Sequence, residues 1–262
     1  MKVKLLSGWS DPGGSTEHHI NLTNLLNENG YDCTFYGPHE YHRSKCKSGS
    51  IQEGLQAVSP ADIVISHFIK FPKNIRLRKH ILSCHETNLF PLKEMDLSQY
   101  DLIHYVSNWQ RDWHGVNHPY KIIPCPIQKV NWVDPRNNIA GVVGSIDEHK
   151  QTHISIERAL KEGYSLVKLF GMGDGEYYRK MVKPYVDSGK AQKMNFVRDK
   201  EEMYNQVSKV YSSSKRECLP MIQGECFAAG IPFSGLECNM RSESDYEFDD
   251  MEILKQWRAI LK

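Results

Sequence analysis

Short apolar runs bounded by glycine or polar residues alternate with amphipathic stretches along this chain. Residues 3–6 form such a run and predict a buried parallel strand. The following loop contains Gly13-Gly14, Ser15 or Thr16 can cap a helix, and Gly30 can end it. A second strand is predicted at 31–36. The order of strand, glycine loop, helix and strand indicates a Rossmann-like unit whose ligand end lies at the glycine loop.

Four more strand-like runs follow, at 62–66, 81–84, 102–106 and 121–123, and each ends in polar or small residues. Open parallel sheets bind ligands at these strand ends. His85 directly follows the second of the four runs, with Glu86 and Asn88 as secondary candidates beside it, and His67 is a rival after the first. A histidine at a strand end is also commonly a structural hydrogen-bonding residue, so both roles stay open.

A polar stretch at 131–138 interrupts the pattern and predicts a domain boundary after residue 133. A second alternation begins at 139–144. It continues with a helix at 151–162, a strand at 166–170, a helix from 176, a strand at 194–197 and a helix from 200 into 209. We therefore expect one α/β domain at 1–133, another at 134–245, and an amphipathic helix within 246–262.

Composition narrows the class of protein. The 262 residues suffice for one large domain or for two of about 130 residues, and the net charge of +1 gives no overall reason to expect nucleic acid. Seven cysteines without a C-x-x-C pair predict free thiols in a reducing compartment. The start is too weakly apolar for a signal peptide and no run resembles a membrane span, so we expect a cytoplasmic protein.

The segment 70–80 is basic and contains no acid. Its cations are Lys70, Lys73, Arg76, Arg78 and Lys79. Such a run is either a solvated helix or loop, or a patch that binds an anionic polymer or a membrane surface by displacing counterions.

The most informative stretch runs from 212 to 233. It places Glu217 and Glu225 on either side of Pro220, which suits the first turn of a helix that runs to Gly230. Glu217 then lies in the loop before the helix and Glu225 on its second turn. A helix start has unpaired N–H groups and partial positive charge, and it therefore suits a phosphate or a polarised sugar hydroxyl.

Ser214 stands three residues before the first acid, and Cys-Phe-Ala-Ala-Gly-Ile-Pro follows the second. This stretch resembles the donor half of the retaining glycosyltransferases of family 4, which often read S-x-x-E-x7-E-A-x-A-x-G-x-P. Cys226 replaces the usual alanine, and residues 218–220 replace a glycine-rich turn. The resemblance implies the GT-B fold, with two facing Rossmann-like domains of parallel sheets, a cleft between them, and a last helix that packs back on the first domain.

The resemblance also implies roles for individual residues. Glu225 would hold the ribose hydroxyls of the nucleotide and Glu217 the hydroxyls of the donor sugar. Gly14 would approach the donor phosphates and the acceptor, and His85 would face the donor sugar. Backbone amides would orient the sugar and phosphate, namely those of Leu219, Met221 and Ile222.

Cations are needed for the diphosphate of a nucleotide sugar. Lys150 fits the lysine of the family's G-R-x-x-x-x-K segment, but Ser145 stands where the family has arginine. Arg198, at a predicted strand end, is the candidate substitute. Gly173 lies in a glycine-rich turn at 171–175 that we place near the nucleotide. That turn lacks the third glycine and the later acid of a dinucleotide fingerprint, so NAD is not expected.

These features predict a retaining glycosyltransferase that moves a hexose from a nucleoside-diphosphate sugar, with a UDP-sugar as the expected donor, by front-face attack. No D-x-D follows a strand, so neither a metal nor another cofactor is expected. The acceptor is open between a glycan, a lipid-linked sugar and, through the basic run, DNA, and the short chain fits a viral origin. The alternatives are a GT-B sugar-nucleotide epimerase and, because of Ser145, an inactive module that binds nucleotide sugars.

Overall fold

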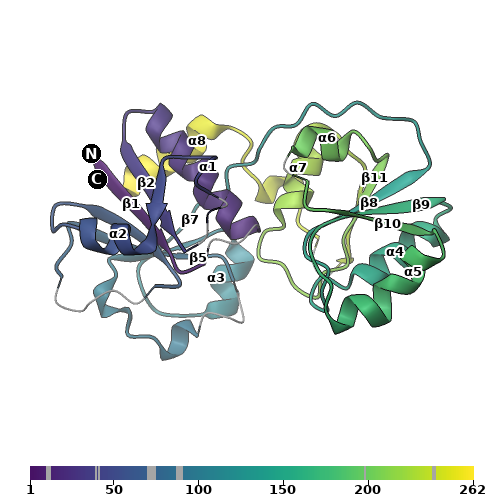
Figure 1. The fold of residues 1–262 in the computed structure, drawn as a ribbon. Helices are drawn as coiled ribbons and strands as arrows, with labels where there is room; N and C mark the ends of the chain where they lie inside the picture. The colour runs from purple at the N-terminus through teal and green to yellow at the C-terminus, as the bar shows by residue number, and fades with distance from the viewer. Residues whose placement is uncertain are drawn as a thin grey trace. The chain divides into compact units, whose positions relative to one another are not determined.

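The computed structural model describes residues 1–9, 13–38, 40, 42–69, 75–86, 91–197, 199–237 and 240–262. They form two compact units (Figure 1). Unit 1 comprises Met1–Ile127 and Ser244–Lys262, and unit 2 comprises Gln128–Glu243. The sequence placed the boundary after residue 133, later than this division. The indole of Trp132 donates to the carbonyl of Val207, and the Val133 amide donates to the Asn205 side chain, so this connecting stretch is tied to unit 2.

Unit 1 contains a parallel sheet in the order β3-β2-β1-β4-β5-β6-β7. Its strands are β1 (Lys2–Ser7), β2 (Asp32–Gly37), β3 (Ser48–Ser50), β4 (Ile63–His67), β5 (Lys79–Cys84), β6 (Leu102–Tyr105) and β7 (Tyr120–Ile122). Its helices are α1 (Gly14–Glu28), α2 (Ile51–Ala57), α3 (Asn108–His114) and α8 (Asp250–Ile260), with short 3₁₀ turns η1 (Leu92–Glu94), η2 (Leu97–Gln99) and, at the junction with unit 2, η5 (Glu243–Asp245).

The N-cap of helix α1 lies two or three residues before the expected polar caps, Ser15 and Thr16. Gly13 is the N-cap, with extended backbone, and no side chain caps the helix. Ser15 and Thr16 therefore lie inside the first turn, and the prediction that one of them caps α1 is wrong. The helix ends at Glu28, and Gly30 follows with φ +83°, a left-handed conformation that glycine adopts without strain.

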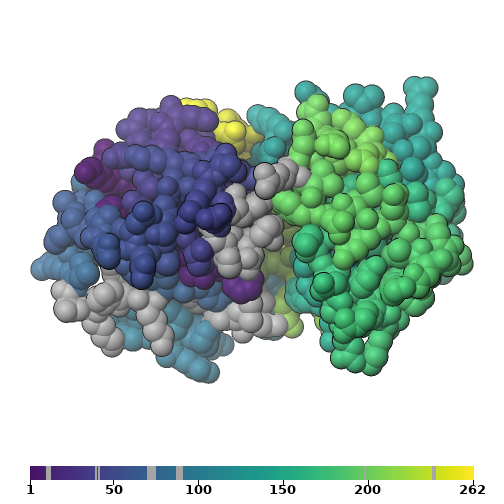
Figure 2. Space-filling model, viewed as in Figure 1, coloured from purple at the N-terminus to yellow at the C-terminus, as the bar shows by residue number. Residues whose placement is uncertain are grey.

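Helix α8 belongs to the core of unit 1 although it comes last in the chain. It packs beside α1, and the yellow C-terminal segment lies next to the purple α1 in the ribbon and space-filling views (Figures 1 and 2). Trp257 is fully buried with Leu254 and Leu261 among the side chains of β1 and α1. The burial of one apolar stripe explains why this polar-rich segment is helical.

Unit 2 contains a second parallel sheet, in the order β10-β9-β8-β11-β12. Its strands are β8 (Ile139–Val143), β9 (Leu166–Phe170), β10 (Ala191–Asn195), β11 (Lys209–Tyr211) and β12 (Phe233–Ser234). Its helices are α4 (Thr152–Lys161), the π-helix η3 (Tyr178–Val182), α5 (Lys183–Asp187), α6 (Lys200–Tyr204) and α7 (Met221–Ala229).

Two predicted elements of unit 2 were misplaced. The strand expected at 194–197 is β10, which begins earlier, at Ala191. The helix expected from 200 into 209 ends at Tyr204, and Lys209 already begins β11. Strand β11 is only three residues long but pairs with β8 in the middle of the sheet, so tertiary pairing overrides the local pattern.

Each sheet has a point at which its strand order reverses. In unit 1 the chain moves from β1 outward through β2 and β3, then crosses to β4 on the other side of β1. In unit 2 it moves from β8 through β9 and β10, then crosses to β11 on the other side of β8. Open parallel sheets bind ligands at such a point, so we expect a ligand crevice at the carboxyl ends of β1 and β4 and a second one at those of β8 and β11.

No helix in the described part of the chain combines the length and apolarity needed to cross a membrane. The described cysteines are all free thiols, in agreement with the sequence: Cys33, Cys46, Cys84, Cys125, Cys218 and Cys226.

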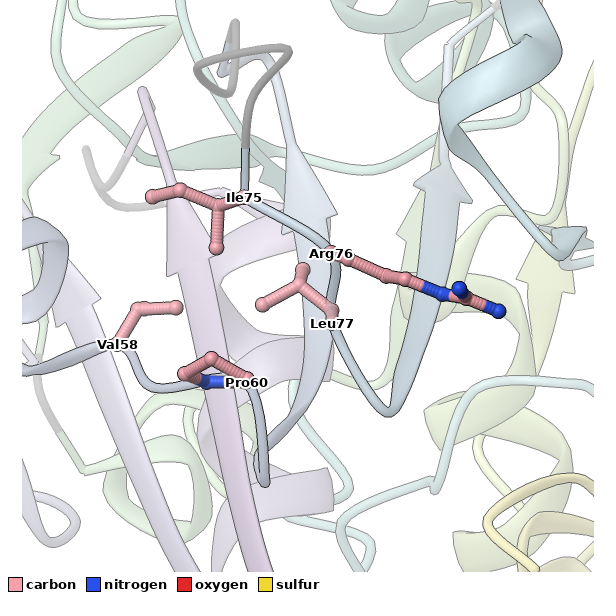
Figure 3. Close-up of a pocket in the computed structure, with 5 residues that line it drawn as sticks. All are labelled: Val58, Pro60, Ile75, Arg76 and Leu77. Atoms are coloured by element: carbon pink, nitrogen blue, oxygen red, sulfur yellow. The ribbon is translucent and has the colours of Figure 1, made fainter.

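A cavity of about 550 Å³ in unit 1 lies away from both crevices (Figure 3). Val58, Pro60, Ile75 and Leu77 line it, and Figure 3 shows the Arg76 side chain extending away from these aliphatic groups. These residues lead into the amino ends of β4 and β5, the sheet edge opposite to the one where parallel sheets bind ligands.

Candidate functional site

The crevice of unit 2 holds an ion pair between its two flanking loops. Loop 144–150 follows β8 and ends in Lys150, and loop 212–220 follows β11 and contains Glu217. Lys150 Nζ lies 2.5 Å from Glu217 Oε1, and the two side chains are 32% and 18% exposed. The two residues predicted to act together are thus in direct contact, at the place where topology predicts a ligand.

Each member of this pair keeps the other ionised. Burial disfavours the charge on Lys150, but the neighbouring Glu217 carboxylate outweighs burial and raises the pKa of Lys150. Burial likewise opposes the charge on Glu217, whereas Lys150 and the Ser214 hydroxyl lower the pKa of Glu217. A protonated lysine therefore stands in the crevice at neutral pH.

Close backbone contacts shape the loop that carries Lys150. A Cβ on Gly171 would lie 1.7 Å from the carbonyl oxygen of Gly144, and a Cβ on Gly173 would lie 2.4 Å from that of Ile146. Gly173 also has φ +152°, so both positions require glycine. The glycine-rich turn predicted near the nucleotide thus packs against the loop of Lys150.

Ser145 supplies a hydroxyl but no charge to this loop. Its Oγ donates to Asp147 at 2.5 Å, and the same carboxylate accepts the backbone N–H of Lys150 at 2.8 Å. Asp147 therefore orders the loop around Lys150. Arg198, the proposed substitute for the family's arginine, lies outside the described residues.

The loop of Glu217 is held by Arg241, a residue that sequence reasoning missed. The Arg241 guanidinium donates to the carbonyl oxygens of Glu217 at 2.6 Å and Cys218 at 3.3 Å. Gln223 on α7 binds the backbone of Arg241 in both directions, at 2.8 and 3.1 Å. Arg241 lies beyond the recognisable motif in a polar loop, and nothing local in the sequence marks it as a partner of the Glu217 loop.

Helix α7 begins directly beside this loop. The helix begins at Met221, so Pro220 is its N-cap and not part of its first turn as expected. Gly230 ends the helix in the left-handed region. Glu217 lies before the helix and Glu225 on its second turn, as predicted. Three backbone N–H groups donate to no other described group, those of Leu219, Met221 and Ile222. The helix start therefore offers donors to an anion.

The Glu225 carboxylate, predicted to bind ribose, is enclosed by neighbouring side chains. Its side chain is 1% exposed, Lys200 Nζ lies 2.6 Å from one oxygen, and the Tyr204 hydroxyl donates to the other at 2.6 Å. Burial and then the nearby carboxylate raise the pKa of Tyr204 well above its usual range. A ribose hydroxyl reaches Glu225 only if one of these two side chains moves.

The crevice of unit 1 is built from histidines. His85 follows β5, is half-buried, and shares a hydrogen bond of 3.0 Å with Ser83 through Nε2. His67, its rival, is fully buried and engages Ser7 at 2.8 Å and Glu86 at 3.0 Å through its two ring nitrogens. His67 therefore fits the structural role, and the better exposed His85 remains the candidate for contact with a ligand.

Two further histidines of this cluster were missed by sequence reasoning. His18 and His19 lie on the buried face of α1, at 4.4 and 4.9 Å from the His85 ring between ring centroids. Burial, followed by repulsion from neighbouring imidazoles, lowers the pKa of His18, His19 and His85 well below its ordinary value. Two adjacent polar residues in line with the apolar stripe that contains Ile20 and Leu22 were the available signal.

Gly14 is the first residue of α1, at the start of the helix that leads away from β1. The predicted Asn88 lies outside the described residues, as do Lys70 and Lys73 of the basic run. Arg76, Arg78 and Lys79 are described and lie before or at the start of β5.

No family model and no curated protein matches this chain. Solved glycosyltransferases share its fold at low sequence identity. HepE of Anabaena in complex with UDP-glucose has a TM-score of 0.70 at 13% identity, covering 91% of this chain and 81% of HepE. AviGT4, a glycosyltransferase of avilamycin A biosynthesis, has a TM-score of 0.67 at 17% identity, covering 99% of this chain and 88% of its own.

An α-glucosyltransferase in complex with UDP has a TM-score of 0.65 at 14% identity, covering 99% of this chain and 90% of its own. At these identities the likeness concerns the fold. This chain has the GT-B architecture of two Rossmann-like units, each built on a parallel sheet.

Proposed function

We propose that this protein is a retaining glycosyltransferase of the family 4 type, which transfers a hexose from a nucleoside-diphosphate sugar to an acceptor hydroxyl. The observation that carries the proposal is the pairing of Lys150 with Glu217 at 2.5 Å in the crevice of unit 2, beside the free amides at the start of α7. A cation and unpaired N–H groups suit a diphosphate, and a carboxylate suits sugar hydroxyls.

The chemistry follows from the charges. Lys150 and the α7 amides stabilise the negative charge that develops on the departing diphosphate, while the anomeric carbon acquires oxocarbenium character. Glu217 accepts hydrogen bonds from hydroxyls of the sugar and shares Lys150 with the phosphate. No second nucleophile is assigned, so the acceptor attacks from the face that the diphosphate leaves, and a phosphate oxygen takes the acceptor proton.

The donor is proposed to be a UDP-sugar. This proposal is supported by the fold shared with HepE and with the α-glucosyltransferase, whose structures contain UDP-glucose and UDP. Glu225 is proposed to bind the ribose after displacement of Lys200 or Tyr204, and His85 to contact the donor sugar. We place the acceptor hydroxyl on unit 1 at the carboxyl edge of its sheet, the edge at which His85 follows β5. Arg76, Arg78 and Lys79 lie before or at the start of β5, at the opposite edge, so they are not assigned to the reacting hydroxyl.

The test is incubation with a panel of nucleotide sugars and acceptors, following the release of nucleoside diphosphate. Release that depends on an acceptor is the expected result. An altered sugar without release would support the epimerase instead, and binding with neither outcome would support an inactive module. Lys150→Met is the test variant and should lose this release. Lys215→Met is its matched control, because Lys215 forms an exposed ion pair with Glu148 in the same unit.

Transfer is proposed to be independent of a metal ion, because Lys150 and the helix start can neutralise the leaving group. We expect activity to be unchanged after dialysis against EDTA. Loss of activity that magnesium or manganese restores would contradict this part of the proposal.

A further inference from the structure

Three side chains with metal-binding atoms converge in unit 1. His18 comes from α1, His85 follows β5, and Cys125 follows β7. One ligand atom from each lies within 4.8 Å of the others. The three residues are far apart in sequence, so the fold brings them together.

The surroundings leave these atoms available. His18 is fully buried, and neither of its ring nitrogens has a hydrogen-bond partner among the residues described. Buried polar groups normally have a partner, so an unpartnered imidazole calls for an explanation.

The geometry is close to that of a tetrahedral metal site. Zinc binds imidazole nitrogen at about 2.0 Å and thiolate sulfur at about 2.3 Å, which places ligand atoms roughly 3.5 Å from one another. The observed separations within 4.8 Å therefore need a contraction of about 1 Å, which side-chain rotation can supply. The rings of His18 and His85 already lie 4.4 Å apart between centroids.

We propose that His18, His85 and Cys125 bind a zinc ion, with water or an exogenous ligand at the fourth position. Two imidazoles and a thiolate suit this borderline-soft cation better than magnesium, which prefers oxygen ligands. The Cys125 thiol is protonated without metal, so binding forms the zinc–sulfur bond and releases one proton to solvent. His85 is half-buried, and it gives the ion a route from solvent.

Neighbouring histidines serve other roles. Both ring nitrogens of His67 are engaged, by Ser7 and Glu86. His104 is bound to Ser83 at 3.0 Å and to the Ile123 carbonyl at 2.8 Å. His19 is buried with unpartnered nitrogens like His18 but is not part of the ligand set, so it provides a matched control.

Binding is tested by titrating Zn²⁺, and Co²⁺ as a coloured substitute, into the full-length metal-free protein. We expect one ion per chain, a cobalt–thiolate charge-transfer band, and one proton released in calorimetry repeated in two buffers. Cys125→Ser should abolish the band and weaken zinc binding about 100-fold or more, since outer partners of a metal site alone contribute 10- to 100-fold. Cys33→Ser, a change at another buried thiol of unit 1, should leave both unchanged.

A second pair of variants guards against misfolding. His18→Gln should remove zinc binding and His19→Gln should retain it, and zinc should raise the melting temperature only of proteins that bind it. Absence of a stoichiometric zinc ion in the folded wild-type protein would overturn the proposal, as would equal affinity in the His18 and His19 variants.

Zinc would also withdraw His85 from the donor sugar, a consequence that rests on the proposed function. We expect zinc to inhibit transfer in wild type and in His19→Gln but not in Cys125→Ser. A wild-type protein that binds zinc without any transferase activity would contradict the proposed function and leave the metal site standing. A protein that is active but binds no zinc would contradict the metal site and leave the proposed function standing.

Discussion

The two sheets place their crevices at equivalent topological positions but fill them with opposite chemistry. The crevice of unit 1 is packed with imidazoles, and burial lowers the pKa of His18, His19 and His85, whereas that of unit 2 contains Lys150 and Glu217, which keep each other charged. In the described part of the chain, the crevice of unit 2 combines a cation with free amides, an arrangement that suits a diphosphate. The fold thus determines where a ligand binds, and the side chains at that edge determine which ligand.

This contrast predicts that acid destabilises unit 1 before unit 2. Burial lowers the pKa of both His80 and His104 to about 4, whereas an unfolded histidine titrates near 6.5. The unfolded state therefore binds more protons, and stability that is complete above pH 6.5 is lost as the pH falls toward 4. Each histidine contributes about 1.4 kcal/mol per pH unit in this window, and hydrogen exchange measured between pH 7 and 4 resolves the two units.

The control for the acid experiment is His104→Gln compared with His149→Gln, which changes an exposed histidine of unit 2. The first change should reduce the pH slope of unit 1, and the second should leave it unchanged. Equal acid sensitivity of the two units would contradict the assignment of neutral imidazoles to unit 1.

Lys150→Met should have the next largest effect. Loss of a positioned donor to a developing negative charge lowers kcat by about 100- to 1,000-fold. The change also leaves Glu217 without its ion-pair partner, and we expect a loss of about 1 kcal/mol in the free energy of unfolding, since the pair is partly exposed. Steady-state kinetics and urea unfolding measure the two effects. Lys215→Met should change neither by more than a small amount, and an equal loss there would refute a specific role for Lys150.

Tyr204→Phe separates the structural and ligand-binding roles of Glu225. The change removes one of the two hydrogen bonds to a buried carboxylate, so the free energy of unfolding should fall by about 2 kcal/mol. It also frees one carboxylate oxygen, and the donor KM should fall or stay unchanged if that oxygen binds ribose. A donor KM that rises in Tyr204→Phe but stays unchanged in Glu225→Gln would contradict the proposed ribose contact.

Arg241→Gln should have the smallest effect. Arg241 positions the carbonyl groups of Glu217 and Cys218 without itself being assigned to the substrate, so we expect kcat to fall about tenfold, a change of about 1.4 kcal/mol, with little change in donor KM. Arg241→Lys retains the charge but not the forked geometry, and it should lose nearly as much activity. Full activity in Arg241→Gln would exclude this positioning role.

The sequence alone was sufficient to predict the elements that depend on local residue patterns. The strand runs, the glycine stops and the helix after Pro220 predicted both Rossmann-like units and placed Glu217 in a loop and Glu225 on a helix. The resemblance to family 4 placed Lys150 and Glu217 in one donor site, and the structure brings these two side chains into contact.

The sequence was insufficient where partners come from distant segments. Arg241 supports the Glu217 loop from beyond the motif, and Lys200 and Tyr204 enclose Glu225 from another helix. The cluster of His18, His85 and Cys125 depends on the packing of α1 against the sheet, and a single sequence does not encode such contacts in its spacing. Strand β11 was likewise missed, because its pairing with β8 and β12 defines it.

The most direct measurement is the affinity for UDP of four proteins, by titration calorimetry in EDTA: wild type, Lys150→Met, Lys215→Met and His85→Gln. The account predicts that UDP binds wild type, Lys215→Met and His85→Gln with similar affinity and binds Lys150→Met at least about tenfold more weakly, as expected for the loss of a charge-assisted hydrogen bond. Equal UDP affinity in wild type and Lys150→Met, or no binding to any of the four folded proteins, would contradict it.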